Sequence, residues 1–383
     1  MNFVEAFVKG QSGTNVGLPT GLPSLDNAIN GLQQKTMIGL ASPPKIGKST
    51  LTDYCFLLYP YLHCVETNRK IEWIYFSFEM DRIQKEFKFA CFFLMYDYNI
   101  STYIHNNKEE PLSSDYLQGK VKDKQTNQVI LIEPRISDAL REIYRNRIVP
   151  LFGEYDVKGN QLSKGVITFI ERKKTSDEMR SIIENHAKGE GIVSYKDIEC
   201  INPTGQKFFI KEPDYYTPQD ENKFTVIITD TLRKIRRDKG QTLKDAVDLW
   251  ISHGVEMRNL YRYTFVNIIH SNRSLSNIDR LKHMAEFLYP TGDDVKDTGN
   301  LSEEADFMLT LFNPTDEKYG ITKHFGLDLY DANHNLIHPY YRSLHLVESR
   351  HGHCPLHMQT NIVANLGYFV KLDRNLPLLP SNH

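Results

Sequence analysis

A lysine and a serine in a short polar segment carry the strongest chemical signal in this sequence of 383 residues. The segment follows an apolar run (36–41) and precedes a helical pattern, so it joins a predicted strand to a predicted helix. Backbone N–H groups of such a loop, with the N-terminus of the next helix, converge on phosphate oxygens. We therefore predict a nucleotide-binding loop. Its members are Ser42, Pro43, Pro44, Lys45, Ile46, Gly47, Lys48, Ser49 and Thr50.

Two residues of this loop have specific predicted roles. Lys48 supplies a positive charge to the β- and γ-phosphates, and the Ser49 hydroxyl is a ligand for Mg²⁺. Ser42 stands at the first position, where the usual pattern has glycine. A chance Gly-Lys-Ser turn is the alternative, and the flanking strand and helix argue against it. The predicted cofactors are therefore ATP and Mg²⁺.

Two carboxylates follow other apolar runs. Asp230 ends the run 224–230, where it is placed to hold Mg²⁺ at the carboxyl end of a strand. A strand-end cap is the alternative role for Asp230. Glu79 follows the run 71–77 and could polarise an attacking water. We predict that both belong to the catalytic site, although Glu79 alone is a weak signal.

The elements that must position these residues alternate between strands and helices. The apolar runs are rich in β-branched residues and are apolar on both faces, which is typical of strands covered on both sides. We predict an α/β fold with a mainly parallel sheet flanked by helices and inserted hairpin and loop elaborations. The predicted strands are 36–41, 71–77, 166–171, 224–230, 264–270, 306–312 and 343–349.

The chain divides into four predicted parts. A polar, turn-rich stretch interrupts the strand and helix rhythm in the middle, and it contains a hairpin turn at Asn202 to Gly205 and a helix whose capping box is Thr175 and Glu178. The parts are an N-terminal arm (1–19), the first part of the core (20–94), an elaborated middle region (95–222) that includes core strand 166–171 and helix 175–187, and the second part of the core (223–383).

The composition excludes several classes of protein. A formal net charge of −2 excludes a wholly basic nucleic-acid coat, and 40% hydrophobic residues exclude a disordered chain. No apolar run is long enough to span a membrane, and the N-terminus lacks the pattern of a signal peptide. Five scattered cysteines do not suggest a disulfide framework. We expect a cytoplasmic protein with no membrane partner.

Five blocks along the chain resemble the DnaB-family replicative helicases, in the order that this family has. They cover about 20–90 and 220–355, and each resembles a motif of the family's ATPase core. The resemblance implies that the α/β fold is of the RecA-like P-loop ATPase type. The blocks are Thr20 to Asp26 with the phosphate loop, Phe76 to Met80, Ile268 to Arg273, Val295 to Asp306, and Val347 to Gly352.

The resemblance implies roles for individual residues. Glu79 falls on the catalytic glutamate, and His270 falls on the polar sensor of the γ-phosphate. Arg350 falls on the arginine finger that enters the neighbouring subunit's site, so the chain is expected to form a homo-oligomeric ring, with six subunits in this family. The segment Lys296 to Gly299, which includes Thr298, falls on a DNA-contacting loop.

Three departures from the family are visible. Only about 20 residues precede the core, so we expect a short, phage-type form without the family's N-terminal primase-binding domain. Glu348 stands where the family has lysine, which predicts a weaker trans half of the site. The distance between Glu79 and Asp230 along the chain is about twice that in the family's core, and the extra residues could hold a surface for a partner.

A basic patch follows Asp230. A motor on single-stranded DNA needs phosphate-contacting groups in a channel, and this patch together with Lys296, Thr298 and Gly299 is the predicted DNA surface. A solvated helix face is the alternative for the patch. A zinc site at His351 to His357 is disfavoured because no second ligand pair is visible. The basic residues of the patch that we assign to DNA are Arg233, Lys234, Arg236 and Arg237.

The predicted function is an ATP-driven ring helicase that moves on single-stranded DNA in replication, 5′→3′ by family resemblance. Nucleotide would be hydrolysed at the subunit interfaces. A primase, a polymerase or a loader is a possible partner. The alternative is a RecA- or KaiC-like ATPase that assembles on DNA or on a partner as a switch without unwinding. Glu348 and the short N-terminus favour this alternative.

Overall fold

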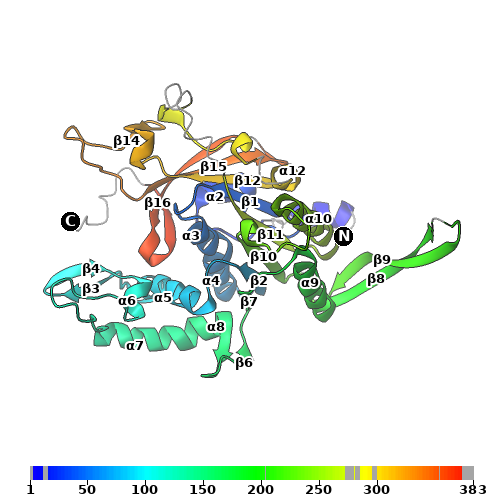
Figure 1. The fold of residues 1–383 in the computed structure, drawn as a ribbon, viewed down its shortest axis with the longest axis horizontal. Coiled ribbons are helices and arrows are strands. Elements are labelled where there is room, and N and C mark those ends of the chain that lie inside the picture. Colours follow the sequence, from blue (N-terminus) through cyan, green and yellow to red (C-terminus); the bar gives the residue numbers. More distant parts are fainter. Residues whose placement is uncertain are drawn as a thin grey trace.

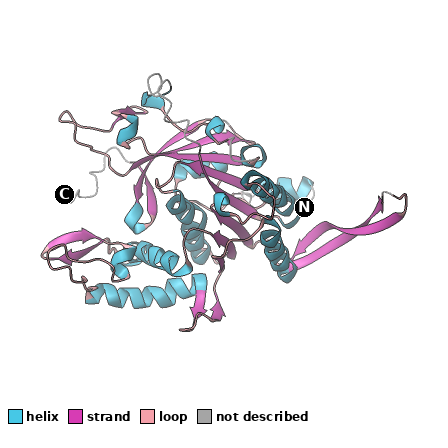
Figure 2. Ribbon diagram, viewed as in Figure 1, coloured by secondary structure: helices cyan, strands magenta, loops and turns pink. Residues whose placement is uncertain are grey.

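The fold is built on a nine-stranded sheet with helices on both faces (Figures 1 and 2). The computed structural model describes residues 3–11, 16–202, 204–271, 280, 285–295, 300–352 and 354–372. The strand order is β17-β16-β15-β12-β1-β11-β10-β2-β7. The strands are β1 (Met37–Ser42), β2 (Ile71–Ser77), β7 (Ile167–Ile170), β10 (Phe224–Asp230), β11 (Thr264–His270), β12 (Phe307–Phe312), β15 (Tyr341–Ser349), β16 (Leu356–Val363) and β17 (Tyr368–Lys371).

The six strands from β12 to β7 pair in parallel, and β15, β16 and β17 pair antiparallel at the other end. The predicted α/β class with a mainly parallel sheet is therefore confirmed. Parallel pairing brings the carboxyl ends of strands that are distant in sequence to one edge. Ser42 pairs with His270, and Asp230 pairs with Ser77. Below, we call this the carboxyl edge of the sheet.

The strands of the parallel part are buried on both faces because two hydrophobic cores cover them. On one face, Leu51 and Phe92 pack in a core that includes Trp73. On the other face, Trp250 packs in a core that includes Phe76. The helices of the first face are α3 (Lys48–Asp53), α4 (Tyr59–Glu66) after a π-helical turn, and α5 (Arg82–Tyr98), and those of the second are α9 (Ser176–Glu190) and α10 (Leu243–Tyr261).

A small subdomain packs beside α5, on the left of Figure 1. It holds part of the long interval between Glu79 and Asp230. Its elements are β3 (Thr102–His105), β4 (Lys108–Pro111), α6 (Ser114–Leu117), α7 (Pro134–Ile143), α8 (Val149–Phe152), β5 (Gly153–Tyr155) and β6 (Gln161–Lys164). The other elements outside the sheet are α1 (Phe3–Gln11), α2 (Pro23–Ile29), α12 (Leu301–Glu304), β13 (Lys323–His324) and β14 (Leu327–Asp328).

A second insertion forms a two-stranded arm, β8 (Gly191–Ile201) and β9 (Lys207–Pro218), which projects from the body between α9 and β10 (Figure 1). The sequence predicted this hairpin from its turn, although Pro203 of the turn lies outside the described residues. Phe208 and Phe209 near the turn are exposed. The capping box of Thr175 and Glu178 is also formed, at the start of α9.

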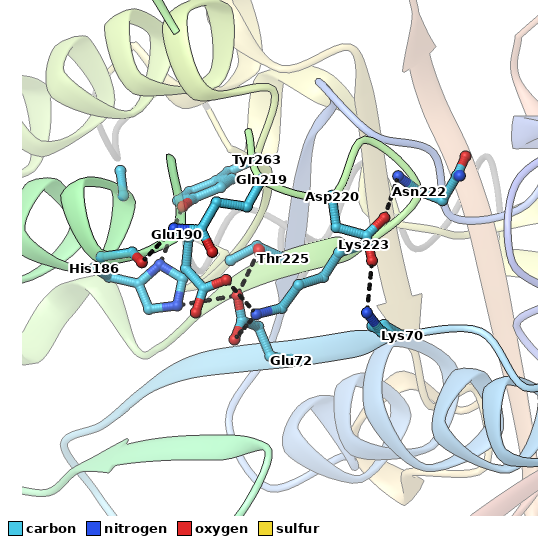
Figure 3. Close-up of polar contacts among 12 residues, drawn as sticks. Lys70, Glu72, His186, Glu190, Gln219, Asp220, Asn222, Lys223, Thr225 and Tyr263 are labelled. Atoms are coloured by element: carbon cyan, nitrogen blue, oxygen red, sulfur yellow. Dashed lines mark hydrogen bonds and ion pairs between the residues drawn. The ribbon is translucent and has the colours of Figure 1, made fainter. Parts of the chain in front are cut away.

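Ion pairs hold the base of the arm on the sheet (Figure 3). The ammonium of Lys223 lies 2.7 Å from carboxylate oxygens of both Glu72 and Glu190, and His186 Nε2 lies 3.0 Å from Glu72 Oε1. Among the described residues, one group has side chains close enough together to hold a metal ion, and it consists of Glu72, His186 and Glu190. Because Lys223 already balances the two carboxylates, we interpret the group as a structural ion-pair cluster.

None of the helices in the described part of the chain combines the length and the apolar character that crossing a bilayer requires.

Candidate active site

The predicted phosphate loop connects the buried end of β1 to the start of α3. Gly47 precedes the helix with a φ of 107°, a conformation that favours glycine. A Cβ atom at this position would lie 2.3 Å from Ile362 Cδ1 of β16. Both the backbone angle and the packing therefore require glycine here, and β16 covers the loop.

Lys48 is buried under this loop, with only 7% of its surface exposed. Its ammonium donates to the carbonyl oxygens of Pro43 at 2.9 Å and Ser42 at 3.3 Å. Burial lowers the pKa of Lys48 to about 8, and the nearby carboxylates of Asp230 and Glu79 oppose that shift. The positive charge is thus placed at the carboxyl edge, beside the predicted acids.

His270 ends β11 directly beside Ser42. Its Nδ1 lies 3.0 Å from Lys48 Nζ. Burial lowers the pKa of His270 to about 4, and the positive charges of Lys48 and Arg233 add to that shift. The ring is therefore neutral at pH 7. Because an ammonium can only donate, Nδ1 is the acceptor and the proton of the ring is on Nε2.

Asp230 ends β10 and is only 4% exposed. The backbone N–H of Phe78, just after β2, donates to the carbonyl oxygen of Asp230 at 2.9 Å and so fixes the end of β10 beside β2. Tyr75 Oη lies 3.5 Å from the carboxylate oxygen Oδ2. The carboxylate and the Ser49 hydroxyl, at the start of α3, are hard oxygen donors of the kind that Mg²⁺ prefers. The donor chemistry of these two residues therefore fits a magnesium ion.

Glu79 lies two residues beyond β2 and is exposed at the same edge. It lines a cleft of about 570 Å³ together with His270. The structure thus brings Lys48, Asp230, Glu79 and His270 to one edge of the sheet. The other residues that line the cleft are Arg233, Lys234, Leu243, Lys244, Val247 and Ile269.

The basic residues after Asp230 lie close to this cleft. Arg233 and Lys234 are exposed and line it. Arg237 is also exposed, whereas the guanidinium of Arg236 pairs with Glu178 at 2.6 Å. The other predicted DNA-contacting residues, Lys296, Thr298 and Gly299, lie outside the described residues.

Arg350 lies at the opposite edge of the sheet from the phosphate loop of its own chain. Arg350 follows β15, and its backbone N–H donates to the carbonyl oxygen of Asp306. The backbone N–H of Asp306 donates in turn to the carbonyl oxygen of Met37, at the start of β1. The phosphate loop follows the other end of β1, a strand of six residues or roughly 20 Å. The guanidinium donates to the Glu303 carbonyl at 2.7 Å. Arg350 therefore does not reach the site of its own subunit.

Two further residues at the site were not predicted from the sequence. Arg342, in the antiparallel part of the sheet, donates from Nε to the carbonyl of Ile46 in the phosphate loop at 3.2 Å. Its Nη1 donates to Asn313 Oδ1 at 2.9 Å. Burial lowers the pKa of Arg342 to about 10. Lys85, on α5, is fully buried and pairs with Asp53 on the helix that follows the loop. No periodic pattern identifies either contact, because each joins distant segments.

Part of the chain matches a known protein family. Residues 17–92 match the model of the DnaB-like helicase C terminal domain. A comparison with curated proteins found no match.

Two solved structures share the fold. One is a DnaB-like replicative helicase whose structure was described with its interactions with primase, at 12% identity and a TM-score of 0.58 over 97% of this chain and 66% of that one. The chain thus spans just under two thirds of that helicase. The other is the ATPase domain of a second protein, at 12% identity and a TM-score of 0.56 over 97% of this chain and 99% of that one.

The likeness to the solved structures supports the fold, and the family match covers the N-terminal part of the ATPase core. The matched segment contains the phosphate loop and Glu79. The chain therefore shares a RecA-like ATPase fold with these two structures, and its residues 17–92 match the DnaB-like helicase C terminal domain.

Proposed function

We propose that this protein is an ATP-driven ring helicase that translocates on single-stranded DNA during replication. The observation that carries the proposal is the convergence of Lys48, Asp230, Glu79 and His270 at one edge of a RecA-like sheet, while Arg350 lies at the other edge. This arrangement matches an active site that one subunit supplies in part and its neighbour completes.

Within one subunit the residues divide the work by their chemistry. Lys48 binds phosphate oxygens as a point charge, and the loop N–H groups and the start of α3 orient the nucleotide. Ser49 and Asp230 would hold Mg²⁺, which neutralises charge on the β- and γ-phosphates when bound. Glu79, exposed in the cleft, orients the attacking water and can accept its proton.

His270 is suited to respond to the γ-phosphate. At pH 7 its ring is neutral, with a proton available on Nε2 and Lys48 bonded to Nδ1. A phosphate that attracts the ammonium of Lys48 would release Nδ1. Nucleotide binding would then break the hydrogen bond between Lys48 and His270 at the end of β11.

The trans half of the site follows from the placement of Arg350. A head-to-tail interface that repeats around a closed ring puts one edge of each subunit against the opposite edge of the next. Arg350 of each subunit would then reach the neighbour's nucleotide. A ring of six subunits is part of the proposal because of the family resemblance. Glu348, two residues before it, lowers the positive charge of this half-site.

The DNA surface is assigned to basic groups at the carboxyl edge. Arg233, Lys234 and Arg237 are exposed there. Lys296 belongs to the DNA-contacting loop that the family resemblance implies. These charges would contact phosphates without reading bases. Arg236 pairs with Glu178, so of the assigned residues it contributes the least charge to DNA phosphates. The proposal includes translocation with 5′→3′ polarity, which follows from the family resemblance. It also includes a primase, a polymerase or a loader as the partner.

The test is strand displacement on a forked duplex with ATP, with ATPase recorded with and without single-stranded DNA. The proposal expects DNA-stimulated ATPase and unwinding that requires a free 5′ tail. Stimulated ATPase with no displacement on any fork would favour an assembling ATP switch instead. An absence of ATPase in both conditions would contradict the proposed active site.

A further inference from the structure

A lysine with no exposed surface lies behind the proposed metal site. Lys85 is 0% exposed, and its partner Asp53 is 4% exposed. A lysine is almost never fully buried unless it is paired, because the loss of hydration of its charge must be offset. The contacts of Lys85 therefore need an explanation.

All three N–H donors of Lys85 are used. Its ammonium donates to both carboxylate oxygens of Asp53, at 2.8 and 3.0 Å, and to the hydroxyl oxygen of Tyr75 at 2.9 Å. The Tyr75 hydroxyl in turn donates to Asp53 Oδ1 at 2.9 Å and lies 3.5 Å from Asp230 Oδ2. We call Lys85, Asp53 and Tyr75 the buried triad. Its Tyr75 hydroxyl lies beside the carboxylate of Asp230.

The buried triad joins three elements that flank residues of the proposed active site. Asp53 is four residues after Ser49 on α3, so the two side chains lie on one face of that helix. Tyr75 lies on β2 and Lys85 on α5, the elements on either side of Glu79. One set of hydrogen bonds therefore links the phosphate-loop helix to β2 and α5, and the Tyr75 hydroxyl of that set lies beside the carboxylate at the end of β10.

We propose that the buried triad positions the Ser49 helix and the Asp230 carboxylate relative to each other, so that Mg²⁺-dependent nucleotide binding depends on it. The inference rests on the proposed nucleotide-binding function. None of the three residues is assigned to touch nucleotide. Groups that orient a metal ligand from behind typically change metal affinity by about 10- to 100-fold when they are removed.

Stability alone is a poor explanation for the triad. A buried ion pair contributes little relative to apolar residues of similar size, and replacing such a pair by apolar side chains is often neutral. A purely structural role would therefore be served as well by two apolar residues. A role in orientation requires the polar atoms themselves.

The experiment measures the binding of a fluorescent ADP analogue at increasing Mg²⁺, and in EDTA. Tyr75→Phe removes only the hydroxyl. The double variant Asp53→Leu/Lys85→Met removes both charges, so it avoids leaving one of them unpaired in the interior. For both variants we expect the half-saturating Mg²⁺ concentration to rise about tenfold. Affinity in EDTA should stay within about twofold of the wild type.

Tyr61→Phe is the matched control. Tyr61 is a buried tyrosine on α4 that packs on Trp73, and it takes no part in the triad. The control should keep the wild-type Mg²⁺ requirement. If the triad variants have a lower melting temperature but the wild-type Mg²⁺ requirement, the positioning role is wrong. If the wild type itself does not bind the nucleotide, the proposed function fails together with this inference.

Discussion

The ammonium of Lys48 lies 3.0 Å from Nδ1 of His270, so the phosphate loop and the end of β11 share a hydrogen bond between two residues with lowered pKa values. Burial is the main cause of both shifts. The bond requires a neutral His270, because a protonated ring has no acceptor for the lysine. The electrostatics of the site thus depend on pH.

The first prediction concerns acid stability. The pKa of His270 in the folded protein is about 4, below its ordinary value of 6.5, so the unfolded chain binds more protons between these values. The contribution of His270 to folding is therefore full above pH 6.5 and is lost as the pH falls toward 4. We expect the melting temperature to fall from pH 7 to pH 5, and to fall less in His270→Gln. An equal fall in the melting temperature of both proteins would contradict the lowered pKa of His270.

The second prediction tests the phosphate loop. Lys48→Ala should reduce ATPase activity by about 100-fold or more, since it removes the charge that faces the phosphates. Lys35→Asn is the control, because Lys35 is an exposed lysine just before β1, with a φ of 59° that asparagine tolerates. The control should retain full activity. Undiminished ATPase in Lys48→Ala would remove the loop from the mechanism.

Gly47 supports the third prediction. Alanine at this position would be strained at a φ of 107°, and its Cβ would meet Ile362 Cδ1. Gly47→Ala should lower the free energy of unfolding by about 1–3 kcal/mol and weaken nucleotide binding. Denaturant unfolding measures the first effect. Adding Ile362→Ala removes the clash and should recover part of the nucleotide affinity. No recovery would show that the strained backbone angle alone causes the loss of affinity.

A fourth prediction separates action in cis from action in trans. Arg350→Ala alone should lose about a thousandfold or more in ATPase activity if it stabilises the transition state. Mixed with Glu79→Gln subunits, it should regain activity, because some interfaces then combine an intact Glu79 with an intact Arg350. The ATPase of the mixture, compared with each variant alone, is the measurement. A mixture that stays inactive at every ratio would argue against shared sites.

The fifth prediction concerns DNA. Lys296→Ala should weaken binding of single-stranded DNA and reduce the slope of log K against log salt by about 0.7 to 1. Lys211→Ala provides the comparison, since Lys211 is an exposed lysine on the projecting arm, away from the assigned DNA surface. Only the first variant should change the slope. Equal slopes in both variants and the wild type would exclude Lys296 from the DNA surface.

The sequence by itself determined the parts of the fold that local patterns encode. Strand, loop and helix around Lys48 are contiguous, so apolar periodicity and the Gly-Lys-Ser spacing predicted them together. The strands ending at Ser77, Asp230 and His270 were also predicted, because strands buried on both faces are continuous apolar runs. Parallel pairing then placed their ends at one edge, as expected for this fold class.

Only the tertiary structure decided which buried polar groups meet. Lys85 lies in an apolar, aromatic helix, and no local pattern pairs it with Asp53 or Tyr75. The contact of Arg342 with the phosphate loop joins segments 296 residues apart. The position of Arg350 at the far edge follows from the antiparallel direction of β15. Such contacts depend on how distant elements pack, and packing leaves no periodic trace along the chain.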